Sequence, residues 1–251
     1  MSNFRLIPSL LLKKNGLYKG IEFANYKYVG DPINAVRIFN AKEVDELFFF
    51  DIEATKNNSS VSLDIISKLA NECYVPFAVG GGINSIEHIQ NLINLGVEKV
   101  CINSHAIKNP DFVSQASEIF GSQAIVVCID FKKDENGYSL YSHSGTRKVE
   151  KDVFDYAIEM EKVGAGEILF NCVNRDGKMQ GFDLAFYTKV SKLLQIPVIA
   201  GCGAGSLQHF KALTSQTQVS AASAGSFFVF HGPHRAVLIS YPKDFKILAT
   251  K

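Results

Sequence analysis

Short apolar runs recur along the chain and alternate with longer stretches in which apolar residues repeat at helical spacing. Runs such as Leu47-Phe48-Phe49-Phe50 and Ile125-Val126-Val127-Cys128-Ile129 are apolar without interruption, which is typical of strands buried on both faces. The pattern predicts eight strands: Arg5–Leu12, Glu46–Asp51, Phe77–Val79, Lys99–Ile102, Ala124–Asp130, Glu167–Asn171, Val198–Ala200 and Val219–Ala222.

Helical stretches separate these strands. The expected helices are Pro32–Lys42, Ser60–Asn71, Ser85–Leu95, Asn109–Phe120, Lys151–Lys162, Asp183–Leu194 and Ser206–Leu213, with one more after the last strand. Eight alternations of strand and helix predict an α/β fold, the (β/α)8 TIM barrel. A doubly wound open sheet would show the same alternation.

An internal repeat favours the closed barrel. The run Pro76-Phe77-Ala78-Val79-Gly80-Gly81-Gly82 has a partial copy that begins at Pro197, 121 residues later, and Glu46-Leu47-Phe48-Phe49 matches the run that begins at Glu167 at the same offset. The run Leu10 to Lys14 matches Ile129 to Lys133 at an offset of 119 residues. Two half-barrels of four strands can close on each other, so we expect a single barrel domain over residues 1–251.

Two segments interrupt the tight alternation. Residues 13 to 31 form a long connection that contains Lys13, Lys14, Lys19 and Gly20, and we expect a mobile flap over one end of the barrel. Residues 132 to 146 are predicted to form a hairpin that turns at Glu135-Asn136-Gly137.

Composition is that of an ordinary globular protein. The 251 residues are 47% hydrophobic and 20% charged with a formal net charge of +1, which gives no electrostatic reason to expect a nucleic-acid or membrane partner. The N-terminus lacks the apolar region of a signal peptide, so a cytoplasmic location is expected. Five widely spaced cysteines without metal-ligand spacing are expected to be reduced core residues, and we expect no metal or cofactor.

Two glycine clusters follow strands at matching positions of the repeat. In a barrel the chemistry lies where the strands run into the following loops, and glycine-rich loops that precede helices are natural phosphate sites. Gly80-Gly81-Gly82 and Gly201-Cys202-Gly203-Ala204-Gly205, completed by Asn103-Ser104 and Gly225-Ser226 after the next strands, predict two such sites and a ligand with a phosphate at each end. For one cluster alone, tight turns would be an equal explanation.

Asp130 is the candidate general acid or base because it ends a long apolar strand. The repeat places its counterpart at position 11, where the chain has Leu11. Asp51 and Asp176-Gly177 could bind ligand hydroxyls or amides, although Asp-Gly is also a plain turn signal. Ser144 is a weaker candidate. His105 and His143 have no matched partner, and we interpret both as ordinary loop or surface residues.

Four charged residues begin predicted strands and therefore lie at the opposite end of the barrel from the chemistry. They are Arg5, Glu46, Lys99 and Glu167. Two acids and two bases there can pair into a ring around the barrel axis. Such a ring either stabilises that end of the barrel or forms a gated entrance, and the pattern leaves both open.

Several motifs together resemble the cyclase subunit of imidazole glycerol phosphate synthase, the HisF family of histidine biosynthesis. They are Val79-Gly80-Gly81-Gly82-Ile83, Phe120-Gly121-Ser122-Gln123-Ala124, Gly164-Ala165-Gly166-Glu167-Ile168-Leu169 and Arg175-Asp176-Gly177, within a resemblance from about Arg5 to His231. The resemblance implies a TIM barrel and an ammonia-dependent synthase or lyase. Its ammonia comes from a separate HisH-like glutaminase through a gate that corresponds to Arg5, Glu46, Lys99 and Glu167.

The family's two phosphate sites correspond to Gly82, Asn103 and Ser104 in one half and to Gly177, Gly203 and Ser226 in the other. The full set of candidate binding residues adds Lys19, Asp51, Gly81, Ser144, Asp176 and Gly225. One of the family's two catalytic aspartates corresponds to Asp130 and the other to Leu11, which cannot transfer a proton. Gly201-Cys202 replaces a serine-glycine pair, and Asn171 replaces a threonine.

The stretches Pro8 to Lys13, Asn25 to Pro32 and Phe228 to Gly232 resemble a HisF-like branch of bacterial surface-polysaccharide (O-antigen, lipopolysaccharide) clusters. With a HisH-like glutaminase and a sugar amidotransferase, that branch converts an acetamido group into an acetamidino group. This role is the expectation for the chain. Two alternatives stay open: a true cyclase in which another residue replaces the lost aspartate, and a non-catalytic scaffold that activates the glutaminase.

Overall fold

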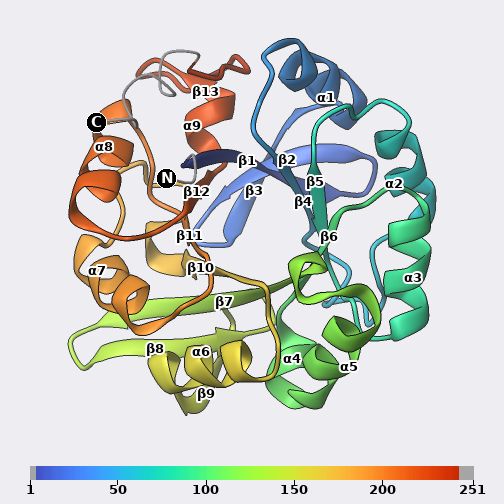
Figure 1. Ribbon diagram of the computed structural model, residues 1–251. Helices are drawn as coiled ribbons and strands as arrows, with labels where there is room; N and C mark the ends of the chain where they lie inside the picture. Colours follow the sequence, from blue (N-terminus) through green and yellow to red (C-terminus); the bar gives the residue numbers. More distant parts are fainter. Residues whose placement is uncertain (1–3, 243–251) are drawn as a thin grey trace.

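The computed structural model describes residues 4–242, and in this range eight parallel strands close into a barrel (Figure 1). Going round the barrel, the order is β10, β11, β12, β1, β4, β5, β6 and β7, and β7 pairs with β10 to close it. The predicted (β/α)8 barrel is confirmed. The strands are β1 (Arg5–Lys13), β4 (Leu47–Asp51), β5 (Phe77–Gly80), β6 (Lys99–Ile102), β7 (Ile125–Asp134), β10 (Glu167–Cys172), β11 (Val198–Gly201) and β12 (Ala221–Ala224).

Helices surround the barrel. They are α1 (Pro32–Ala41), α2 (Leu63–Ala70), α3 (Ile86–Asn94), α4 (Ser104–Lys108), α5 (Asp111–Phe120), α6 (Val153–Lys162), α7 (Leu184–Leu193), α8 (Leu207–Gln216) and α9 (Ser226–Val229). Short 3-10 turns cover Ser122–Ala124 and Val173–Arg175. The short helix α4 was not predicted. It lies between β6 and Pro110, the N-cap residue of α5, so the expected helix Asn109–Phe120 begins later at Asp111.

The two halves of the structure match closely. Helices α6, α7 and α8 begin at residues 153, 184 and 207, each 121 residues after α1, α2 and α3, which begin at 32, 63 and 86. The first helix of each half also starts in the same way. Asp31 accepts a hydrogen bond from the Asn34 amide at 2.8 Å, and Asp152 accepts from the amides of Phe154 and Asp155 at 2.8 and 3.0 Å. Such caps satisfy helix N–H groups that have no partner within the helix.

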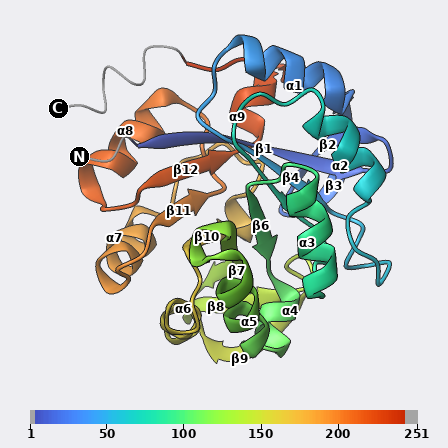
Figure 2. The ribbon, with the colours of Figure 1, turned by 45° about the vertical axis from the view of Figure 1, so that its right-hand side comes forward.

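Each half also carries an antiparallel extension after its first strand. β2 (Gly16–Ile21) and β3 (Ala24–Gly30) continue β1, and β8 (Gly137–Ser142) and β9 (Arg147–Asp152) continue β7. Figures 1 and 2 show the two extensions on different sides of the barrel. The segment expected as a mobile flap is therefore paired strand. The second segment forms the predicted hairpin with a further strand, β9, so the helix expected at Lys151 begins at Val153.

Two apolar clusters make up the core. The larger lies between the strands and the helices, and the smaller fills the inside of the barrel. The inner cluster consists of Ile7, Phe48, Ala78, Cys101, Val126, Cys128, Leu169, Ile199 and Ala221, with Phe50 packed against it. The short pair β13 (Phe230–His231) and β14 (Ala236–Val237) follows the barrel. No helix in the described range is long and apolar enough to span a membrane.

Candidate functional site

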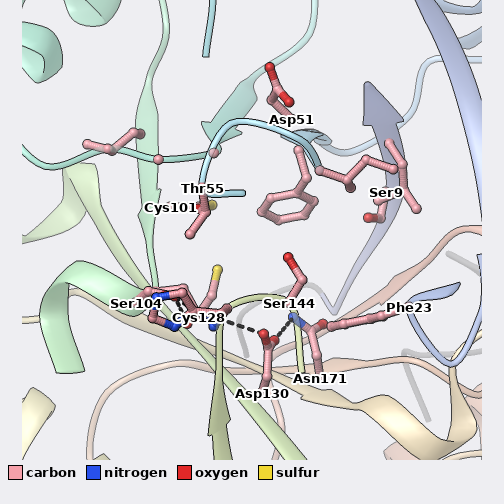
Figure 3. A pocket seen from close by; sticks show the side chains of 18 of the residues that line it. Ser9, Phe23, Asp51, Thr55, Cys101, Ser104, Cys128, Asp130, Ser144 and Asn171 are labelled. Atoms are coloured by element: carbon pink, nitrogen blue, oxygen red, sulfur yellow. Dashed lines mark hydrogen bonds between the residues drawn. The ribbon is translucent and has the colours of Figure 1, made fainter. Parts of the chain in front are cut away.

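A cavity of about 290 Å³ opens at the carboxyl ends of the barrel strands, called the mouth here (Figure 3). It is lined by loops of both halves and by the β2–β3 extension. This size and position suit a phosphorylated small molecule. Within residues 4–242, no group of three or more His, Cys, Asp or Glu side chains lies close enough to hold a metal ion.

Asp130 lies in this cavity on β7, with only 4% of its surface exposed. The Asn103 side-chain amide donates to Oδ2 at 2.9 Å, and the Asn171 amide donates to Oδ1 at 3.0 Å (Figure 3). Burial raises the pKa of Asp130 to about 6, and the nearby Asp176 acts in the same direction, against the two amide hydrogen bonds. A carboxyl with this pKa can exchange a proton near neutral pH.

Leu11 lines the cavity with three other residues of low polarity, Phe50, Cys101 and Cys128. We call these four residues the apolar patch. Leu11 and Phe50 are paired in register on β1 and β4. The Cys101 thiol and burial raise the pKa of Cys128 well above its ordinary value, so Cys128 is a protonated thiol. The mouth thus places the Asp130 carboxyl in the same cavity as an apolar surface, together with Asp51 and Asp176.

Lys19 reaches the cavity from β2 and is 6% exposed. Its ammonium donates to the backbone carbonyl of Ser9, and a side chain at position 225 would overlap it, so Gly225 leaves room for Lys19. Burial lowers the pKa of Lys19 to about 8, although Asp176 opposes this effect. Lys19 can therefore lose or gain a proton in mildly alkaline solution.

Asp176 connects the β2–β3 extension to the loop after β10. Its Oδ2 accepts a hydrogen bond from the Phe23 amide at 3.3 Å, and its backbone carbonyl accepts from the Glu22 amide at 3.1 Å. Lys178 forms a salt bridge with Glu22 at 2.7 Å. Burial raises the pKa of Asp176, while Lys19 lowers it. The tip of the extension is thus bonded to the opposite half of the barrel, with Phe23 and Tyr26 lining the cavity.

Two residues of the first glycine cluster, Gly81 and Gly82, line the cavity. Gly81 and Gly82 have φ of +131° and +64°, and a side chain at Gly82 would overlap the Ser59 carbonyl. Asn103 and Ser104 lie beside the cavity on the next connection. Asp51 also lines it, but its carboxylate accepts hydrogen bonds from the amides of Glu53 and Ala54 at 2.9 and 3.0 Å. Asp51 therefore stabilises its own turn.

The second glycine cluster is placed differently. Gly225 and Cys202 line the cavity, but Gly177, Gly203 and Ser226 do not. A side chain at Gly177 would overlap the Gly20 carbonyl, and one at Gly203 would overlap the Gly181 carbonyl. Close backbone packing therefore accounts for Gly177 and Gly203 without a ligand.

His105, on α4, and His143, in the turn between β8 and β9, are partly exposed, and both line the cavity, which their interpretation as ordinary loop or surface residues did not anticipate. The His143 backbone amide donates to Ser104 Oγ at 3.0 Å, which links the β8–β9 turn to the first glycine half of the mouth. His143 and Ser144 have φ of +51° and +57°. The sequence signal for this turn is the following Gly145, but nothing in the sequence showed that the turn reaches Ser104. Ser144 lines the cavity as expected.

Arg5, Glu46, Lys99 and Glu167 form a closed ring at the other end of the barrel, called the floor here. Arg5 contacts Glu46 at 2.6 Å and Glu167 at 3.0 Å, and Lys99 contacts the same two carboxylates at 2.8 and 3.1 Å. Although burial opposes it, the carboxylates of Glu167 and Glu46 raise the pKa of Arg5. We call these four residues the charged ring. The inner apolar cluster lies between the charged ring at the floor and the cavity at the mouth.

Comparison with known proteins places the whole chain. The model of a family described as "Histidine biosynthesis protein" matches residues 5–234. A Pseudomonas aeruginosa protein provisionally named imidazole glycerol phosphate synthase subunit hisF2 is 47% identical over 239 residues, 95% of each chain. The chain belongs to the HisF family.

Other HisF proteins align over most of their length. A Leptospira interrogans protein, also provisionally named as a HisF subunit, is 44% identical over 243 residues, 95% of this chain and 94% of its own. The imidazole glycerol phosphate synthase subunit HisF of Staphylococcus saprophyticus is 42% identical over 224 residues, 88% of this chain and 89% of its own. The HisF match therefore includes both halves of the barrel.

Proposed function

We propose that this HisF family member is an ammonia-dependent synthase subunit that no longer carries out the cyclase reaction. Its ammonia comes from a HisH-like glutaminase docked on the floor. The ammonia serves the conversion of an acetamido group of a surface-polysaccharide sugar into an acetamidino group, together with a sugar amidotransferase.

The charged ring supports the ammonia route. Each carboxylate of the ring contacts both cations, so a small change in side-chain position can exchange one contact for another and open a passage for a small neutral molecule. Two large apolar side chains are exposed at the same end, one in a connection and one in a helix. Tyr74, before β5, is 83% exposed, and Ile119, at the end of α5, is 58% exposed. Exposed aromatic and aliphatic side chains suit a protein interface.

The observation that carries the proposal is the replacement of the second mouth carboxylate by Leu11. Proton transfers that need two carboxylates on opposite sides of a substrate are not possible with Asp130 alone. The apolar patch beside Asp130 instead fits the methyl group of an acetamido substituent. The amides of Asn103 and Asn171 and the Asp130 carboxyl can meet its polar atoms.

The first test supplies the purified chain with the cyclase family's bis-phosphate substrate and excess ammonium salt, which removes the need for a glutaminase. We expect imidazole glycerol phosphate to form at least about a hundred-fold more slowly than with a HisF enzyme that has both aspartates, the usual scale for a lost general acid or base. Leu11→Asp should recover part of this rate. Product at the full rate from the unaltered chain would show that it is a true cyclase.

A second arm follows nitrogen from [15N-amide]glutamine into the sugar by mass spectrometry, with the glutaminase and the amidotransferase present. Asp130→Asn should lower the transfer about ten-fold or more. Asp134→Asn, at the exposed end of the same strand β7, is the matched control and should have no effect. Equal transfer by Asp130→Asn and the unaltered chain would instead support a non-catalytic scaffold.

A further inference from the structure

Four basic side chains gather at one edge of the mouth cavity. His105 and Lys108 belong to α4, His143 lies in the turn between β8 and β9, and Arg147 is the first residue of β9. His105, Lys108 and His143 line the cavity. Arg147 contacts the His143 ring. We call these four residues the basic rim. Its two parts are far apart in sequence and come from different halves of the barrel.

The position of His143 is fixed from three sides. Its backbone amide donates to Ser104 Oγ at 3.0 Å, its Nδ1 lies 3.0 Å from Ser142 Oγ, and its Nε2 lies 3.4 Å from Arg147 Nη1. A guanidinium can only donate, so Nε2 accepts, and the neutral ring carries its proton on Nδ1. The ring therefore has a defined orientation next to Ser104, whose hydroxyl donates to Asn103 Oδ1 at 3.5 Å.

Lys108 lies near both imidazoles. Burial lowers the pKa of His105 and of His143, and Lys108 lowers both further, with Arg147 also acting on His143. His105 is held edge-on against Phe112, with ring centres 4.6 Å apart. In residues 4–242 neither Lys108 nor Arg147 forms a salt bridge with an acidic side chain. The edge of the cavity thus carries two positive charges without an acidic partner.

The basic rim borders donors that are themselves uncharged. Gly82, Asn103 and Ser104 offer backbone and side-chain donors, which suffice for one phosphoryl group at a glycine-rich connection. A second phosphoryl group attached to the first would lie against two cations and two imidazoles. We infer that the basic rim binds the second phosphoryl group of a diphosphate ester whose first phosphoryl group lies at Gly82, Asn103 and Ser104.

This inference rests on the proposed function and names its substrate class. The sugar that receives nitrogen would enter the mouth as a diphosphate-linked sugar, and the ligand of the histidine cyclase reaction, with a monophosphate at each end, would leave the basic rim unused. A diphosphate carries more negative charge than a monophosphate, so the two cations discriminate between them. The preference of the rim can be measured without any nitrogen transfer.

The test is calorimetric titration of the full chain with inorganic pyrophosphate and with orthophosphate, at low ionic strength because the rim is exposed. We expect pyrophosphate to bind on the order of ten-fold more tightly than orthophosphate. Lys108→Ala and Arg147→Ala should each remove most of this difference and leave orthophosphate binding nearly unchanged. Lys148→Ala is the matched control, because it is the next residue on β9 and its side chain points to the other face of the strand.

Two outcomes would overturn the inference. In one, the chain binds the two anions equally well. In the other, it prefers pyrophosphate but keeps that preference in Lys108→Ala and Arg147→Ala, so the preference arises elsewhere, for example at Lys19. A normal cyclase rate in the first assay would refute the proposed function, while the calorimetric preference would still report on the rim. The two failures are thus distinguishable.

Discussion

Asp130 is a buried carboxyl whose hydrogen-bond partners are neutral amides. Asn103 and Asn171 donate to its two oxygens, but neither brings a positive charge, so the cost of burying the ionised form is only partly offset. This explains why the pKa of Asp130 rises to about 6 even though both oxygens are hydrogen-bonded. At neutral pH the ionised Asp130 carboxylate therefore lowers the stability of the folded state.

A pH-dependent stability difference follows. The folded chain keeps the Asp130 proton up to a pKa of about 6, whereas the unfolded chain releases it near 3.8, so the folded state binds more protons between these values. Its stability relative to Asp130→Asn should fall as the pH rises from about 4 to about 6, by on the order of 3 kcal/mol. Denaturant unfolding of both proteins across this pH range measures the difference in their free energies of unfolding. Carboxyl groups that titrate in the same way in both proteins contribute nothing to this difference. A difference independent of pH would contradict the raised pKa.

For single residues, the sequence predicted those at strand ends and two from the extensions, Lys19 and Ser144, but not His105 and His143. Asp130 and Asn103 lie on or beside barrel strands, whose ends meet at the mouth in any TIM barrel. His105 and His143 reach the same cavity through a short unpredicted helix and a left-handed turn. Their meeting depends on the Ser104 to His143 hydrogen bond, which joins residues 39 positions apart and leaves no local pattern.

Among the elements, the β2–β3 extension buries few of its side chains and is held at its tip by hydrogen bonds to Asp176. Most side chains of β3 are exposed, and the tip at Glu22 and Phe23 is bonded to Asp176 across the mouth. The Asp176 carboxylate accepts from a backbone amide and lies among buried groups. The Glu22 to Lys178 salt bridge is exposed, with side chains 45% and 35% accessible. Anchoring therefore depends more on Asp176 than on Lys178.

This ordering predicts local opening of the extension. Asp176→Ala should increase hydrogen exchange of the peptide that covers residues 17–30 by about five-fold or more, since it removes a hydrogen bond and the negative charge beside Lys19. Lys178→Ala removes only the exposed salt bridge and should change exchange much less. Hydrogen–deuterium exchange with mass spectrometry compares the two variants directly. Equal effects of the two changes, or none, would refute the anchor.

The two extensions also show what the pattern of the chain could not reveal. Each was recognised as an interruption, but one was expected as a flap and the other as a hairpin. The structure shows that they are equivalent parts of the repeat, each continuing the first strand of its half. The equivalence is hidden because their sequences have diverged, although β2 and β8 have the same length and keep the same offset of 121 residues as the three helix pairs.

For the whole molecule, the charged ring joins the two halves at the floor. Arg5 and Lys99 belong to the first half and Glu167 to the second, so the ring closes across both junctions of the half-barrels. Glu46, 2% exposed, is the most buried member of the ring. Removing its charge would leave two cations with one carboxylate between them.

Glu46→Gln should therefore lower the free energy of unfolding by on the order of 3 kcal/mol, the usual scale for removing one partner of a buried ion pair. Glu72→Gln is the matched control, because the Glu72 to Arg37 salt bridge lies on the exterior and should contribute little. Denaturant unfolding at pH 7 measures both. A similar loss in the two variants would show that the ring has no special part in stability.

The near-symmetry of the two halves has one last consequence, for direction. A mouth built from two identical halves would admit an elongated ligand equally well in either of two orientations. Here Leu11 stands where the resemblance to the HisF family implies a second carboxyl, and the basic group beside Gly225 is the buried Lys19 rather than a group of side chains like the basic rim. The two ends of the mouth therefore differ chemically, although the framework is duplicated. A ligand with unequal charges at its two ends would therefore bind in one orientation only.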